Sequence, residues 1–186
     1  MPDTNVSIVT QLSDLFDAYG ARDYGEHCTQ YEHMAQCGWW ADQRGCKEPL
    51  VLAAFLHDIG HLIAEDQALP ERDRWGYRFH DSLGADWLEA RGLPATVTNP
   101  IRLHVQAKRY LVATRPGYAD GLSAASRATL AQQGGPYDAA ACRQFEAHPG
   151  SADAVVLREL DELGKSDDFE LPPITVWLER LRRFVV

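Results

Sequence analysis

A histidine and an aspartate stand side by side at the end of an uninterrupted apolar segment, and this dyad limits what the chain can fold into. The segment Leu50 to Leu56 has the composition of a buried helix, and His57 and Asp58 follow it directly. An imidazole and a carboxylate held against a core are costly there unless a cation takes their lone pairs. We therefore interpret His57 and Asp58 as metal ligands.

The length of 186 residues is sufficient for one core and short for two, so we expect a single domain over residues 1–186. The fractions of hydrophobic residues (45%) and charged residues (24%) are those of an ordinary globular protein. No apolar run approaches the roughly 20 residues that span a bilayer. The N-terminus also lacks a basic segment followed by an apolar one. We expect a cytoplasmic protein without membrane contact.

Charge and cysteine content exclude two further classes. A formal net charge of -9 opposes an extended nucleic-acid surface, because phosphate backbones require a basic face. The four cysteines have neither C-x-x-C spacing nor the density of a disulfide-stapled secreted domain, so we expect reduced and mostly buried thiols. An anionic substrate would need a local basic pocket.

Helical signals dominate and strand-like alternation is nearly absent, which predicts an all-α fold of about eight or nine helices around one core. Apolar stripes at helical spacing end at capping glycines such as Gly20 and Gly92. The stretch from Ile63 to Tyr77 has the polar composition of a loop. The expected helices cover residues 8–19, 29–44, 49–57, 79–91, 123–133, 138–147 and 151–163, with one more between Pro100 and Pro116 and a last one from Pro173 to Arg183.

Six ligand-capable side chains fall on the inward faces of these helices. Four imidazoles and two carboxylates are too many for one structural zinc, which is four-coordinate and usually rich in thiolates. Imidazole and carboxylate together favour iron or manganese over calcium, and a carboxylate such as Asp58 can bridge two ions. We expect two octahedral metals held by His33, His57, Asp58, His80, His104 and Asp161.

Most of these ligands have a simpler interpretation when each is considered alone. A single histidine inside a helix, such as His33, is more often a hydrogen-bonded core residue. Asp161 lies between Glu159 and Glu162, as on a solvated acidic face. The dyad is the exception, because the apolar run before it places it against the core. The ordered set, rather than any one member, indicates a metal site.

The order His33, His57-Asp58, Asp161 resembles the HD superfamily, which consists mostly of metal-dependent phosphohydrolases. The interposed His80 and His104 are similar to those of HD members that hold two metals, among them hydrolases and oxygenases. Further segments strongly resemble the diiron HD-domain oxygenases that cleave the carbon–phosphorus bond of 1-hydroxy-2-aminoethylphosphonates, distant relatives of myo-inositol oxygenase. These segments are HDIGH (57–61), HVQAKRYLV (104–112), LSAASRATL (122–130) and QGGP (133–136), and the similarity covers roughly residues 23–165.

The resemblance implies a helical HD domain with a mixed-valent Fe(II)/Fe(III) pair and O2 as the co-substrate. One iron would be held by His33, His57, Asp58 and Asp161, and Asp58 would bridge to a second iron bound by His80 and His104. The products would be phosphate and glycine, or glycine betaine if the amine is methylated.

A second set of residues would bind the hydroxyphosphonate. Lys108 follows His104 by four residues and shares its helical face, and Arg158 precedes Asp161 by three. An acidic protein must concentrate such donors to bind a phosphonate. The resemblance implies phosphonate contacts from His61, Lys108, Ser126 and Arg158, with Thr129 and Gln133 as further pocket residues, and catalytic roles for Asp58, His61 and Lys108.

Tyr24 and Glu26 lie in a segment, Asp23-Tyr24-Gly25-Glu26, that resembles the family's lid over the iron. There a tyrosine can occupy the open coordination position, and a glutamate can pair with the substrate ammonium. This chain departs from the family pattern, because its stretch between Asp23 and His33 is one residue shorter. The departure puts the positions of Tyr24 and Glu26 in question.

The amine end of the substrate depends on nearby aromatic residues. A quaternary ammonium has no N–H and is recognised by aromatic faces beside an acidic charge. Since such residues gather near Glu26, we expect the substrate 1-hydroxy-2-(trimethylammonio)ethylphosphonate. The alternatives are the primary amine, 2-amino-1-hydroxyethylphosphonate, and a dinuclear HD phosphohydrolase. The aromatic residues in question are Tyr24, Tyr31, Trp39 and Trp40.

Overall fold

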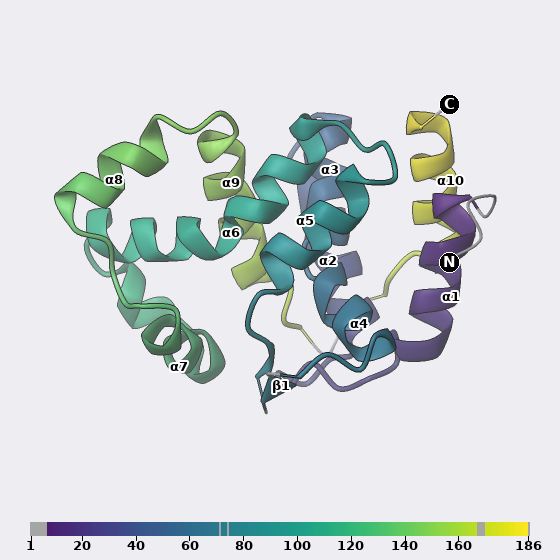
Figure 1. Cartoon of the computed structure of the whole chain (residues 1–186), viewed down its shortest axis with the longest axis horizontal. Coiled ribbons are helices and arrows are strands. Elements are labelled where there is room, and N and C mark those ends of the chain that lie inside the picture. The colour runs from purple at the N-terminus through teal and green to yellow at the C-terminus, as the bar shows by residue number, and fades with distance from the viewer. Residues whose placement is uncertain (1–6, 71, 74, 167–169, 186) are drawn as a thin grey trace.

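The computed structural model describes residues 7–70, 72–73, 75–166 and 170–185, and these form a helical bundle (Figure 1). The predicted all-α fold is confirmed, with one two-stranded ribbon added to it. The described elements are α1 (Ile8–Tyr19), α2 (Gln30–Gln43), α3 (Glu48–Leu56), α4 (Ile59–Asp66), β1 (Arg72–Asp73), β2 (Gly76–Tyr77), α5 (His80–Glu89), α6 (Ala95–Thr114), the 3-10 helix η1 (Tyr118–Gly121), α7 (Ala124–Gln132), α8 (Ala139–Glu146), α9 (Ser151–Leu163) and α10 (Ile174–Phe184).

A capping box fixes the start of α2. The Thr29 hydroxyl accepts the Glu32 backbone N–H, and the Glu32 carboxylate accepts the Thr29 N–H in return. Such reciprocal bonds satisfy donors that the first turn of a helix leaves unpaired. The second partner, Glu32, immediately precedes His33. The capping box therefore fixes the position of His33 in the first turn of α2.

The sequence prediction was wrong about the segment after the dyad. Helix α4 begins at Ile59 and runs to Asp66, where we expected a loop from Ile63 onward, and the described α-helices therefore number ten. The helix is short and has no side-chain cap. Because Ile59, Leu62 and Ile63 are buried, tertiary packing of one face stabilises it. The dyad thus lies at the junction of two helices, α3 and α4.

Helix α6 also begins earlier than predicted. It starts at Ala95, so Pro100 lies inside its second turn. A proline there removes one backbone hydrogen bond, a loss that the rest of a 20-residue helix tolerates when the residue is buried. The helix carries both His104 and Lys108, two of the predicted site residues.

Two apolar clusters hold the bundle together. In the larger one, three rings stack: Phe16 on Phe55 with centroids 5.3 Å apart, and Phe55 on Trp177 at 4.7 Å. The smaller one packs α6 against α8 and α9 through Leu103 and Phe145. In Figure 1, α7 and α8 lie at one end of the molecule and α1 and α10 at the other. Helices α6 and α9 contribute to both clusters and join the two ends.

Helices α4 and α5 cross at close range through two glycines. A Cβ on Gly60 would lie 2.0 Å from the His80 carbonyl oxygen, and a Cβ on Gly84 would lie 3.1 Å from the Gly60 nitrogen. No larger residue fits at Gly60 without moving backbone. The crossing brings His80, the first residue of α5, next to Asp58.

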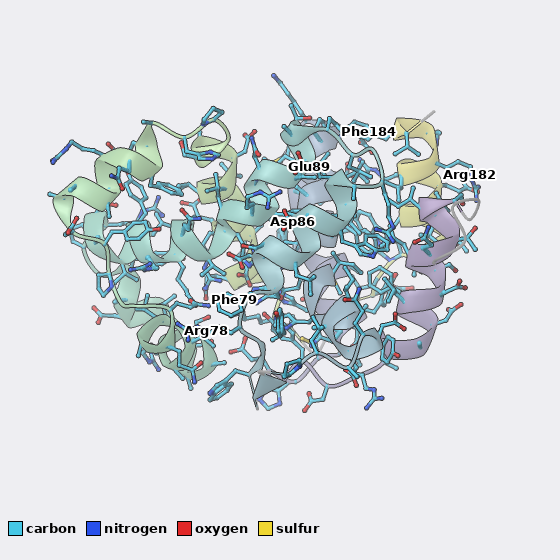
Figure 2. All side chains as sticks on the ribbon, in the orientation of Figure 1. Arg78, Phe79, Asp86, Glu89, Arg182 and Phe184 are labelled. Carbon is cyan, nitrogen blue, oxygen red and sulfur yellow. The ribbon has the colours of Figure 1, made fainter. Side chains whose placement is uncertain are left out.

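An ion-pair cluster ties α5 to α6 on the outer surface. Asp86 and Glu89, labelled in Figure 2, both pair with Arg102 of α6, Glu89 at 2.7 Å. Exposed pairs of this kind contribute little to stability individually. They lie on the outer faces of the two helices that carry His80 and His104.

The cysteines behave as the sequence predicted. All four are free thiols, of which Cys28, Cys37 and Cys142 are buried and Cys46 is half-buried. None of the helices in the described ranges combines the length and apolar character that crossing a membrane requires.

Candidate metal centre

The first group of predicted ligands converges from α2, the α3–α4 junction and α9. The His33 Nε2 lies 3.2 Å from the His57 Nε2, 3.5 Å from Asp58 Oδ2 and 3.4 Å from Asp161 Oδ1. All four side chains are buried. Two imidazole nitrogens and two carboxylate oxygens thus surround one small volume.

The second group lies on the other side of the same aspartate. The His80 Nε2 lies 3.1 Å from the His104 Nε2, and these nitrogens are 3.4 and 3.6 Å from Asp58 Oδ1. Asp58 therefore directs one carboxylate oxygen to each group. This is the arrangement a bridging carboxylate needs, so the structure brings together all six residues that the sequence singled out as ligands.

Hydrogen bonds fix the tautomer of the four histidines. In each ring Nδ1 faces a backbone carbonyl, which can only accept, so Nδ1 carries the proton and the Nε2 lone pair is free. Partners of this type orient metal-binding imidazoles. The pairs are His33 with Gly164 at 2.7 Å, His57 with Ala54 at 2.9 Å, His80 with Tyr77 at 2.9 Å, and His104 with Ile101 at 2.7 Å.

The donor atoms of the six residues lie so close together that they repel one another unless cations are bound between them. Free lone pairs about 3 Å apart, as in each histidine pair, repel unless a positive charge lies between them. Asp161 Oδ1 is buried and has no hydrogen-bond partner among the described residues. Mixed nitrogen and oxygen donors suit iron or manganese. These six residues could hold two such ions.

Electrostatics keep four of the six donors, Asp58, Asp161, His57 and His104, in the state that binds metal. At His33 burial lowers the pKa, but Cys37 and Asp161 outweigh it and raise that pKa well above the usual value. Burial raises the pKa of Asp58, but the surrounding imidazoles, His57 first, outweigh it and lower that pKa. Burial also raises the pKa of Asp161, but the positive charge of Arg158 outweighs it, and the pKa is lowered well below the usual range. Burial lowers the pKa of His57 and of His104, so both rings are neutral near pH 7. The two carboxylates are ionised.

His61 differs from the other histidines of the site. Its Nδ1 accepts the Tyr77 backbone N–H at 3.0 Å, and burial lowers its pKa to about 3. The ring is neutral and its proton is on Nε2, 4.0 Å from Asp58 Oδ1. His61 therefore presents a hydrogen-bond donor rather than a metal ligand.

A pocket of about 550 Å³, counted with its open mouth, adjoins Asp58. Trp75 and Lys165 line it as well, and the sequence did not predict either of them. All eight residues predicted as substrate contacts line it, namely Tyr24, Glu26, His61, Lys108, Ser126, Thr129, Gln133 and Arg158.

Cationic side chains gather on one wall of the pocket. The Lys108 ammonium donates to the Thr129 hydroxyl at 2.8 Å, and Arg158 donates to Ser126 at 3.1 Å while pairing with Asp161. Burial, reinforced by repulsion from Arg158, lowers the pKa of Lys108 to about 7. An anion placed here would restore the full charge of Lys108.

The loop before α2 covers the first ligand group. The Tyr24 ring stacks on His33 with centroids 3.8 Å apart, and the Tyr24 N–H donates to the Cys28 carbonyl at 2.9 Å. Both Tyr24 and Glu26 line the pocket despite the shorter segment. The loop closes through pairing of Asp23 with Thr29.

The expected aromatic cluster does not form at the pocket. Tyr31, Trp39 and Trp40 pack against the larger apolar cluster instead. All three residues belong to α2 and contact the larger apolar cluster. Their closeness to Glu26 in sequence therefore does not bring them to the pocket. Among the described residues, the aromatic side chains other than histidine that line the pocket are Tyr24 and Trp75.

Curated proteins resemble the chain over most of its length, although no family model matches it. It is 39% identical to 1-hydroxy-2-(trimethylamino)ethylphosphonate dioxygenase (glycine-betaine-forming) of Leisingera caerulea, over 96% of this chain and 91% of that protein. It is 35% identical to hydroxymethylphosphonate dioxygenase of Gimesia maris, over 89% and 82%. An uncharacterized protein of Acanthamoeba polyphaga mimivirus is also 35% identical, over 89% and 76%.

Proposed function

Because the chain belongs to the family of phosphonate dioxygenases, we propose that it uses O2 to cleave the carbon–phosphorus bond of 1-hydroxy-2-(trimethylammonio)ethylphosphonate, forming glycine betaine and phosphate. The reaction balances without another reductant, since the CH(OH)–phosphonate group and O2 give a carboxylate, phosphate and a proton. The observation that carries the proposal is Asp58, which directs its two oxygens to separate histidine pairs at the edge of a pocket with a cationic wall.

We propose that the chain is one HD domain, residues 1–186, with a mixed-valent iron pair as its cofactor. His33, His57, Asp58 and Asp161 would hold one iron, and Asp58, His80 and His104 the other. The iron pair would supply the redox chemistry with O2 that amino-acid side chains cannot perform. The protein contributes binding, orientation and control of charge.

The phosphonate would bind at the cationic wall. Lys108 and Arg158 offer charged donors, and the hydroxyls of Ser126 and Thr129 lie within hydrogen-bond distance of these two cations. Charge-assisted hydrogen bonds of this type orient an anion firmly. They would hold the hydroxyl-bearing carbon beside Asp58, and such positioning is a large part of what a protein adds to a difficult reaction.

Two further groups act near the reacting carbon. The Nε2–H of His61 would donate to a substrate oxygen. The Gln133 Oε1 is buried without a hydrogen-bond partner in the described part of the chain, so it can accept the substrate hydroxyl. Together they would favour one orientation of the carbon–phosphorus bond.

Tyr24, Trp75 and Glu26 would receive the trimethylammonium group. Two aromatic rings and a carboxylate in the lining of the pocket match a cation that has no N–H to donate. Burial, together with the charges of Asp58 and Asp161, raises the pKa of Tyr24 well above its usual value, so its ring stays a neutral phenol.

The test is product analysis with the iron-loaded protein. Oxygen uptake, glycine betaine and phosphate should appear in equal amounts, and none should form without O2. If the primary amine or hydroxymethylphosphonate is turned over with a higher kcat/KM than the trimethylammonio compound, that compound is not the preferred substrate. Hydrolysis of phosphoesters with Mn²⁺ or Mg²⁺ in the absence of O2 would identify a phosphohydrolase instead.

A further inference from the structure

Lys165 joins Glu26 on the covering loop to Ser126 on the cationic wall through its ammonium group. Its Nζ lies 2.9 Å from Glu26 Oε2 and 3.2 Å from the Ser126 hydroxyl. The Lys165 and Glu26 side chains are only 13% and 12% exposed. Further contacts run to Glu162 at 3.5 Å and to Ser123 at 3.5 Å. A nearly buried ion pair therefore occupies the pocket in which the substrate would bind.

The backbone beside Lys165 is anchored to the metal centre. Gly164 accepts the His33 Nδ1–H at 2.7 Å, and a Cβ on Gly164 would lie 2.4 Å from Cys37 Sγ. The close contact fixes where the chain leaves α9. Glu26, in contrast, is carried by the loop between Asp23 and Thr29. The pair thus joins an anchored cation to a carboxylate on the covering loop.

Lys165 and Arg158 meet at the same hydroxyl. Both donate to Ser126 Oγ, Arg158 at 3.1 Å and Lys165 at 3.2 Å, and Ser126 lines the cationic wall. An anion bound at Ser126 would lie within reach of the Lys165 ammonium. Lys165 therefore stands between its internal carboxylate partners, of which Glu26 is nearer than Glu162, and an anion supplied by a ligand.

We propose that the substrate binds by exchanging ion pairs with the protein, and that Lys165 thereby determines specificity. The phosphonate takes Lys165 as its partner at Ser126, and Glu26, released from Lys165, pairs with the trimethylammonium group. This deepens the proposed function and rests on it. No covalent bond is formed or broken in the exchange: the single Lys165–Glu26 pair is replaced by two ion pairs with the substrate.

The exchange favours substrates that carry both charges. An anion without a cationic end would take Lys165 and leave the Glu26 carboxylate nearly buried and unpaired. Leaving a buried charge without a partner is strongly unfavourable. A phosphonate without a cationic group should therefore bind more weakly, because it leaves the Glu26 carboxylate unpaired. This penalty adds to the attraction between Glu26 and an ammonium group.

Calorimetry on the metal-loaded protein without O2 tests the exchange, with inorganic phosphate as the anion and the trimethylammonio substrate as the zwitterion. Glu26→Gln removes the competitor for Lys165, so it should bind phosphate about tenfold tighter and the zwitterion about tenfold more weakly. Lys165→Met should weaken phosphate binding. In the Lys165→Met background, Glu26→Gln should no longer improve phosphate binding, because there is no ammonium left to release.

Two outcomes would overturn the exchange. One is a loss or no change of phosphate affinity in Glu26→Gln. The other is that Glu26→Gln raises the phosphate affinity equally in the presence and absence of Lys165. That result would mean that removing a negative charge acts on the anion directly and not through Lys165. Circular dichroism of each variant checks folding, and the double variant supplies the control. Binding as described without turnover would contradict the proposed function alone, whereas turnover with uniform effects of both variants would contradict only the exchange.

Discussion

Five histidines surround Asp58, and the partner of Nδ1 separates one of them from the rest. His33, His57, His80 and His104 donate Nδ1–H to carbonyls and keep Nε2 free. His61 accepts a backbone N–H at Nδ1 and must carry its proton on Nε2. One hydrogen bond therefore decides whether the Nε2 of a ring presents a lone pair or an N–H donor.

Replacing His80 or His104 by Ala should lower the bound iron from about two to about one per chain. Each ring provides the only nitrogen of its helix to the second group, so oxygenation should be lost while the helices stay folded. Iron analysis and circular dichroism measure both effects. His148→Ala is the matched control, because His148 is exposed and its Nδ1 faces the Pro149 carbonyl, outside both ligand groups. Full iron content in either site variant would contradict a dinuclear centre.

Lys108 should make anion binding depend on pH. Its pKa is about 7 in the free pocket, and a bound anion raises it. Affinity should therefore be constant below pH 7 and fall by up to about tenfold per pH unit above it. Sulfate is a suitable probe, because it does not titrate in this range, and calorimetry from about pH 6 to 9 measures the slope.

Lys108→Gln should remove this pH dependence and weaken sulfate binding overall. Lys47→Gln makes the same change of charge at an exposed position and should leave the slope intact. An unchanged slope in Lys108→Gln would assign the titration to another group.

At the level of elements, the second histidine pair depends on how closely α4 and α5 cross. Gly60→Ala would place a methyl group against the His80 carbonyl, so α5 must move away from Asp58. We expect about 1–3 kcal/mol of lost stability and weaker binding of the second ion. Thermal unfolding and iron content measure the two effects.

Gly121→Ala provides the comparison for this variant. A Cβ on Gly121 meets nothing within 4 Å, so both stability and iron content should stay near those of the unchanged protein. Wild-type iron affinity in Gly60→Ala would mean that the crossing does not position His80.

At the scale of the whole molecule, the two ligand groups connect α2, α5, α6 and α9 with the α3–α4 junction. Metal ions bound there would act as additional cross-links between helices that otherwise meet mainly through apolar packing. Because ions bind the folded chain selectively, loading should stabilise it. Binding at a concentration about 100 times Kd contributes about 2.7 kcal/mol.

Removing metal should therefore lower the unfolding temperature. For a chain of this size, the expected decrease is about 5–10 °C. Differential scanning calorimetry of iron-loaded and chelated protein measures it. The difference should shrink in the His80→Ala variant, which lacks a ligand of the second group. Equal unfolding temperatures with and without metal would mean that the ions do not bridge the bundle.

The fold class could be predicted because it depends on local patterns, and the six candidate ligands named from the sequence lie together in the structure. Apolar residues at helical spacing identify buried faces wherever those faces later pack. His57 and Asp58 were recognisable because an apolar run directly precedes them. Sequence order and resemblance indicated the other ligands, whereas the tautomer of each ring depends on a carbonyl from the folded backbone.

Only the tertiary structure decided which residues complete the pocket. Lys165 follows a helix end, where a lysine is ordinarily solvated, and it reaches Glu26 from a position 139 residues away in sequence. Trp39 and Trp40 are near Glu26 in sequence, yet they are half-buried against the larger apolar cluster. Helix α4 forms because its apolar face is covered. Contacts between distant segments follow from packing, which local sequence patterns do not encode. The sequence by itself therefore determined the helical class and the candidate ligands, but not the surroundings of those side chains.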